Sequence, residues 1–82
     1  HVVLAPGHIN GEARVIGWNT REINMFISRS AEGDFWYFGK PTAYANRRMG
    51  LAVAFHGDIE EARRNAEIIA HFAEKQILYG GS

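Results

Sequence analysis

The chain has 82 residues, 46% of them hydrophobic, and its nine Lys and Arg residues balance nine Asp and Glu residues. This length allows one small domain with a buried core, and the apolar content excludes a disordered tail. The balanced charge excludes a general field for nucleic acid or an anionic membrane, so any recognition of an anion must be local.

Features that the sequence lacks limit the cellular compartment and the processing that we expect for this protein. It has no Cys, so disulfides and thiolate chemistry are excluded. No apolar run approaches the roughly 20 residues of a membrane span, and no signal-peptide pattern is visible. We therefore expect a cytoplasmic protein without membrane or nucleic-acid partners. Because the chain starts with His1 and not Met, we expect a piece of a longer protein.

Short apolar segments predict four to six strands. In chain order they are HVVLA (1–5), EARVIGW (12–18), EINMFIS (22–28), DFWYFG (34–39), MGLAVAFHG (49–57) and ILYGGS (77–82). Gly33 and Asp34 suit a hairpin connection between the third and fourth segments. Alternation in DFWYFG places Trp36 and Phe38 on one face and Phe35 and Tyr37 on the other, so one of these pairs belongs to the core.

The last third of the chain predicts an amphipathic helix from Asp58 to Lys75. Asp58 is a candidate N-cap, and Glu61 completes a capping-box pattern. An apolar stripe follows at helical spacing, formed by Ile59, Ala62, Ala66, Ile69 and Ala73. We expect a single α+β domain over residues 1–82, a small antiparallel β-sandwich or open barrel with one C-terminal amphipathic helix.

The segment FGKPTAYANRRMG (38–50) gathers three of the nine basic residues, Lys40, Arg47 and Arg48. A phosphate needs several converging donors, which Lys supplies as a point charge and Arg as a bidentate fork. The alternative is that the three bases are solvated surface charges. The segment is not a Walker A loop, because the upstream glycine and the Ser or Thr after Lys are missing.

Other kinds of chemistry have weaker support. The four histidines do not match a zinc-binding spacing, so we predict no metal site. Neither Ser28, Ser30 nor Thr20 has the context of an activated nucleophile, so we predict no catalytic residue in this chain. The aromatic run DFWYFG can stack on RNA bases, but the basic footprint of an RNA-binding protein is missing.

The span from Phe38 to Ala54, FGKPTAYANRRMGLAVA, resembles the C-terminal domain of ATP-grasp enzymes of purine biosynthesis. The resemblance is strongest to the formate-dependent phosphoribosylglycinamide formyltransferases, in which a strand leads into FGKP, a short loop, RR(L/M)G and a strand of small apolar residues. The helix from Asp58 to Lys75 also fits this family. Upstream of Asp34 the resemblance thins to the general order of short strands.

The resemblance implies an activity and a role for the basic segment. Enzymes of this family use ATP and Mg²⁺ to activate formate as a formyl phosphate and transfer the formyl group to the amine of glycinamide ribonucleotide. ATP and Mg²⁺ bind outside the region that this chain resembles, so the chain alone is expected to be inactive. The positions that match Lys40, Arg47 and Arg48 hold the ribonucleotide 5′-phosphate.

Two alternatives stay open. The chain can be a free-standing anion-binding or interaction module, or the C-terminal domain of a related ATP-grasp carboxylase such as the aminoimidazole ribonucleotide carboxylase. The formyltransferase interpretation requires Lys40 and Arg47 to face one pocket. It also requires an apolar surface where the remaining ATP-grasp domains of the parent chain pack. The resemblance further implies a homodimer of the parent enzyme, formed through its other domains.

Overall fold

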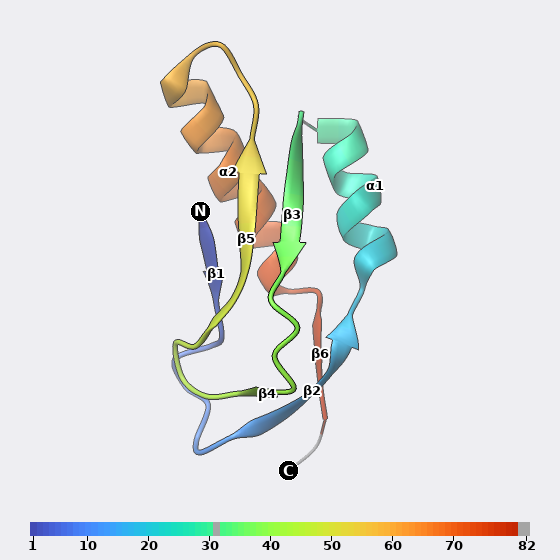
Figure 1. The fold of residues 1–82 in the computed structure, drawn as a ribbon, viewed down its shortest axis with the longest axis vertical. Helices are drawn as coiled ribbons and strands as arrows, with labels where there is room; N and C mark the ends of the chain where they lie inside the picture. Colours follow the sequence, from blue (N-terminus) through green and yellow to red (C-terminus); the bar gives the residue numbers. More distant parts are fainter. Residues whose placement is uncertain (31, 81–82) are drawn as a thin grey trace.

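The computed structural model describes residues 1–30 and 32–80 and contains two helices and six strands (Figure 1). Their order is β1 (Val2–Leu4), β2 (Ala13–Trp18), α1 (Thr20–Ser30), β3 (Gly33–Tyr37), β4 (Thr42–Ala43), β5 (Arg48–Ala54), α2 (Ile59–Glu74) and β6 (Ile77–Tyr79). The strands form two antiparallel three-stranded sheets, ordered β1-β5-β3 and β4-β2-β6. The predicted α+β class with a C-terminal amphipathic helix is confirmed. Neither described helix has the length and hydropathy of a membrane span.

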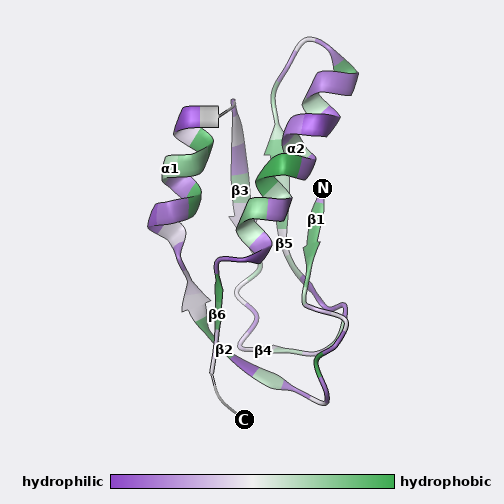
Figure 2. Ribbon diagram, turned by 180° about the vertical axis from the view of Figure 1, so that it is seen from behind, coloured by the Kyte–Doolittle hydropathy of each residue, from purple (hydrophilic) through white to green (hydrophobic). Residues whose placement is uncertain are grey.

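Helix α2 covers one face of the β1-β5-β3 sheet, as the two opposite views in Figures 1 and 2 show. The pairs Phe35↔Ala52 and Tyr37↔Gly50 place the core-facing side chains of β3 and β5 on this face. The helix contributes mainly small buried residues, namely Ala66, Ile69, Ala70 and Ala73. Small side chains let the helix approach the sheet closely.

Aromatic rings join the second sheet to the first. The ring of Trp18, at the end of β2, lies 5.3 Å from Phe35 and 5.2 Å from Tyr37, measured between centroids. Burial raises the pKa of the Tyr37 hydroxyl, with a smaller contribution from the Asp34 carboxylate, and burial also raises the pKa of Tyr79. Neither hydroxyl has a hydrogen-bond partner within the described chain.

The strand predicted over residues 22–28 is wrong, because these residues lie within helix α1. Ile23 is fully buried, and the ring of Phe26 lies 4.2 Å from that of Phe72 on α2. Ile23, Phe26 and Ile27 recur at i, i+3 and i+4, which is the spacing of one helix face. The expected hairpin at Gly33 and Asp34 is therefore also wrong, since β3 follows a helix.

The helix predicted after Asp58 is confirmed, with two differences. Asp58 caps α2, its Oδ1 accepting from the backbone N–H of Glu60 at 2.8 Å and of Glu61 at 3.4 Å. The reciprocal half of the capping box is not formed, because the Asp58 N–H donates to His56 Nδ1 and the Glu61 carboxylate pairs with Arg64 at 2.6 Å. Ile59, expected in the apolar stripe, is 75% exposed. The chain's last two residues, part of the predicted final segment, lie outside the described residues.

Candidate anion-binding site

The basic segment is a structured connection between β3 and β5. Phe38 N–H donates to the carbonyl of Met49 at 3.2 Å, which extends the pairing of the two strands by one step. Gly39 then adopts φ +64°, a left-handed conformation that suits glycine, and turns the chain into Lys40. The short strand β4 follows and pairs with β2, so the middle of the segment is anchored to the second sheet while its ends continue β3 and β5 of the first.

A tight turn presents the two arginines. Arg47 N–H donates to the carbonyl of Tyr44 at 3.0 Å and closes the turn. Asn46, directly before Arg47, adopts φ +64°, a region that Asn tolerates better than most residues. The turn is also tied to the residue after β1. Asn46 N–H donates to the Ala5 carbonyl at 3.2 Å, and Ala5 N–H donates to the Arg47 carbonyl at 2.8 Å. The backbone beside the arginines is thus fixed from two sides.

The three bases predicted from the sequence lie around one surface depression of about 340 Å³. Its lining consists of Lys40, Tyr44, Asn46, Arg47 and Arg48. Among the described residues, no acidic side chain lines it, and none of its bases pairs with a carboxylate. Unpaired positive charges of one sign around a hollow favour an anionic ligand. Their convergence is observed, and their binding of phosphate stays a prediction.

Arg47 differs from the other two bases because it also holds the loop together. Its Nη1 donates to the Thr42 carbonyl at 2.9 Å and to Thr42 Oγ1 at 3.2 Å. Its guanidinium carbon lies 5.0 Å from the centroid of the Tyr44 ring, within the range of a cation–π contact. These contacts use one nitrogen and one face of the guanidinium, so Nε and Nη2 stay available to a ligand.

Tyr44, Asn46 and Thr42 were not predicted as parts of the site. Tyr44 and Asn46 line the depression, and Thr42 orients Arg47. The sequence carries one sign of this arrangement, since Asn directly before two arginines is suited to a left-handed turn position. The contacts of Thr42 and Tyr44 with Arg47 depend on the closed turn and could not be predicted from residue spacing.

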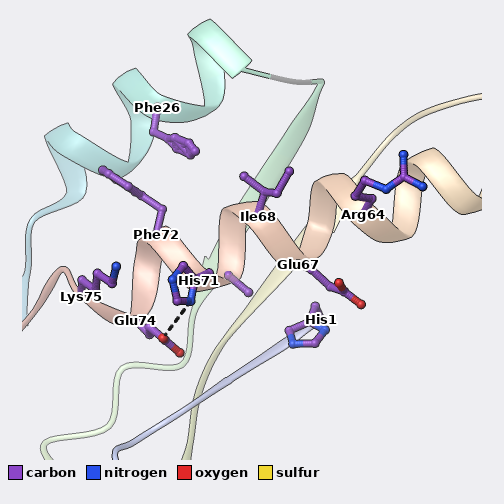
Figure 3. A pocket seen from close by; sticks show the side chains of 10 residues that line it. His1, Phe26, Arg64, Glu67, Ile68, His71, Phe72, Glu74 and Lys75 are labelled. Carbon is purple, nitrogen blue, oxygen red and sulfur yellow. Dashed lines mark ion pairs between the residues drawn. The ribbon is translucent and has the colours of Figure 1, made fainter.

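A second, larger depression of about 560 Å³ lies over α2 and is bounded by Phe26 and His1 (Figure 3). Its charged residues are of both signs, and the His71 imidazole contacts the Glu74 carboxylate at 3.2 Å. Mixed charges do not select an anion or a cation. Across residues 1–30 and 32–80, no group of three or more His, Asp or Glu side chains is placed to hold a metal ion.

Comparison with known protein families decides how this geometry is interpreted. The family described as "PurT, C-terminal" matches residues 20–72, which is more than half of the chain. The chain belongs to this family. The matched span contains all three bases, the whole of α1 and α2 as far as residue 72, so the likeness reaches further upstream than the motifs alone indicated.

Curated proteins similar to this chain include several named formate-dependent phosphoribosylglycinamide formyltransferase. The protein of Methanococcus maripaludis is 59% identical over 71 residues, which are 84% of this chain and 18% of that protein. The protein of Pyrococcus horikoshii is 54% identical over 64 residues, 77% of this chain and 15% of that protein. The chain therefore spans less than a fifth of these relatives. No solved structure matches it.

Proposed function

We propose that this chain is the substrate-phosphate-binding domain of a formate-dependent phosphoribosylglycinamide formyltransferase. Lys40, Arg47 and Arg48 bind the 5′-phosphate of glycinamide ribonucleotide in the depression between β3 and β5. The observation that carries the proposal is the convergence of these bases on one hollow without an acidic neighbour among the described residues. The names of the relatives favour a formyltransferase over a carboxylase.

The three bases contribute in different ways. Lys40 is a point charge with three rotatable donors, and the exposed Arg48 offers a planar fork that matches two phosphate oxygens. Arg47, fixed by Thr42, presents Nε and Nη2 in a preorganised position. A ligand held by a rigid donor loses less side-chain entropy on binding. Holding the phosphate in this way orients the distant amine of the substrate for reaction.

The chemical step belongs to the rest of the parent enzyme. We propose that ATP and Mg²⁺ bind outside this chain, where ATP activates formate for transfer to the substrate amine. The role of this domain is then to position the substrate, and the isolated chain has no formyltransferase activity. The chain's share of its relatives' length, 15–18%, supports this division of labour.

The test is binding of glycinamide ribonucleotide to the 82-residue chain by isothermal titration calorimetry. Lys40→Ala and Arg48→Ala are each expected to raise Kd at least tenfold, which corresponds to about 1.4 kcal/mol. Arg63→Ala, at an exposed base of α2 outside the depression, removes the same charge and is expected to change Kd less than twofold. If all three variants bind as the unmodified chain does, or lose affinity equally, the proposed site is wrong.

A further inference from the structure

The β1-β5-β3 sheet has a second face, opposite to α2. Alternation and register place on it a set of apolar side chains that we call the open sheet face: Val2, Trp36, Leu51, Val53 and Phe55. Val2, Leu51 and Trp36 lie directly opposite one another across the three strands. Phe55 continues the row of β5, because its N–H donates to the Glu32 carbonyl at 2.8 Å. Figure 1 views the sheet from this side, and no helix or strand crosses in front of it.

The open sheet face is unusually apolar for a water-facing surface. Trp36 is 59% exposed, Phe55 58% and Val2 37%. Asp34 also lies on this face, and the exposed Glu32 lies opposite Phe55 at its end. An antiparallel sheet that faces water normally alternates apolar and polar residues, so that its outer face is polar. Contiguous exposed aromatic and aliphatic residues of this kind mark an interaction surface.

We propose that the open sheet face packs against the remainder of the formyltransferase chain. This inference rests on the proposed function, which makes the chain one domain of a larger enzyme. More than four-fifths of each similar relative lies outside the region that this chain matches, so a partner of sufficient size is covalently supplied. Trp36 and Phe55 give that partner large apolar anchors, the kind of residue that dominates interface energetics.

The open sheet face and the basic depression are close in sequence. Trp36 is four residues before Lys40, and the chain between them leaves β3 at Tyr37 and turns at Gly39. Phe38 is itself exposed. A domain packed on Trp36 is therefore within a few residues of the segment that carries Lys40.

The test is hydroxyl-radical footprinting of a full-length chimaera, the Methanococcus maripaludis relative with its matched 71 residues replaced by those of this chain. Oxidation of Trp36 and Phe55 is expected to fall at least fivefold in the chimaera relative to the 82-residue chain. Ile68, exposed on the outer face of α2, is the matched probe and is expected to change less than twofold. A chimaera in the Pyrococcus horikoshii relative repeats the measurement in case the first host misfolds.

Two results overturn the proposal. One is oxidation of Trp36 and Phe55 in both chimaeras at the rate of the 82-residue chain. The other is protection of Trp36 from oxidation that increases with the concentration of the 82-residue chain. That result would mean that the open sheet face binds a second copy of the chain. As a second measurement, Trp36→Lys is expected to lower the Tm of the chimaera by more than Ile68→Lys does. Equal effects of the two substitutions contradict the proposal.

The docking proposal and the phosphate site fail separately. Footprinting needs no nucleotide, and Lys40→Ala is expected to leave the protection of Trp36 unchanged. Conversely, the 82-residue chain binds the ribonucleotide phosphate without the rest of the enzyme. Exposed Trp36 in a chimaera that still binds glycinamide ribonucleotide would reject the docking surface alone. Lost phosphate binding with Trp36 still protected would reject the site alone.

Discussion

Arg47 braces its loop and also lines the basic depression. Its guanidinium donates to two oxygens of Thr42 and lies over the Tyr44 ring. A lysine keeps the charge but has neither the planar face nor the fork that makes both contacts. The structure therefore shows that Arg47 braces the loop, a role that the spacing of Lys40, Arg47 and Arg48 in the sequence does not distinguish from ligand binding.

Arg47→Lys is expected to lower the free energy of unfolding by about 1 kcal/mol, because the hydrogen bonds to Thr42 and the ring contact are lost. Urea denaturation measures the change. Arg48→Lys, at an exposed arginine without a hydrogen-bond partner among the described side chains, is the control and is expected to change stability by less than about 0.5 kcal/mol. Equal losses in the two variants would mean that Arg47 does not brace the loop.

Gly50 is a position at which the core leaves no room for a side chain. A Cβ there would lie 2.6 Å from Phe35 Cζ and 2.9 Å from the Trp36 carbonyl oxygen. Phe35 has little room to move, because it packs between Trp18 and Tyr37. Gly50→Ala is therefore expected to cost about 1–3 kcal/mol of stability, measured by thermal unfolding. Gly57→Ala, where a Cβ meets nothing within 4 Å, is the control, and a similar Tm for both variants would contradict this account.

At the scale of the elements, local patterns predicted the structure where local interactions determine it. The alternation of β2 and the capped α2 were predicted because their patterns lie within the element. Helix α1 was missed because residues 22–28 alone are an apolar run rich in isoleucine. Its helical nature shows only over Thr20–Ser30, with Glu22 in the first turn and Arg29 in the last. Strand β4 has two residues and depends on pairing with β2, which no local pattern records.

The Asp58 cap at the N-terminus of α2 is expected to stabilise the folded chain. Asp58→Ala removes the acceptor for two backbone N–H groups and is expected to cost about 1 kcal/mol of stability. Chemical denaturation followed by circular dichroism measures the loss. Glu67→Ala, at an exposed position within the same helix, is expected to be neutral or slightly stabilising. An Asp58→Ala variant as stable as Glu67→Ala would show that the cap does not stabilise the helix.

At the scale of the whole molecule, one covered sheet face and one open face explain both the stability and the proposed role. The core lies mainly between α2 and the β1-β5-β3 sheet and extends to Ile23 of α1, Ala43 of β4 and Ile77 of β6. The family resemblance predicted the convergence of the three bases. It could not predict that Tyr44 lines the depression, because this depends on the closed turn, or which residues form the open face, because this depends on the register of strands distant in sequence.

Tyr37 and Tyr79, both half-buried, make the free energy of unfolding depend on pH in the alkaline range. Their pKa values are raised in the folded state, so above about pH 10 the unfolded chain loses these protons first. Stability is therefore fully present below that pH and falls as the pH rises toward the folded pKa. Tyr37→Phe with Tyr79→Phe is expected to flatten this decline in urea melts at stepwise pH, with little loss at neutral pH because neither hydroxyl has a partner within the described chain. Tyr44→Phe, at the exposed tyrosine, is the control, and an unchanged decline in the double variant would contradict the assignment.

The central claim is that Lys40, Arg47 and Arg48 hold a substrate phosphate. Its most direct test is an NMR titration of the 82-residue chain with glycinamide ribonucleotide and with the corresponding ribonucleoside, which lacks the phosphate. We expect the ribonucleotide to shift the amide resonances of residues 40–48 and the ribonucleoside to bind at least tenfold more weakly. Equal binding of the two compounds, or shifts confined to α2 and the larger depression, would contradict it.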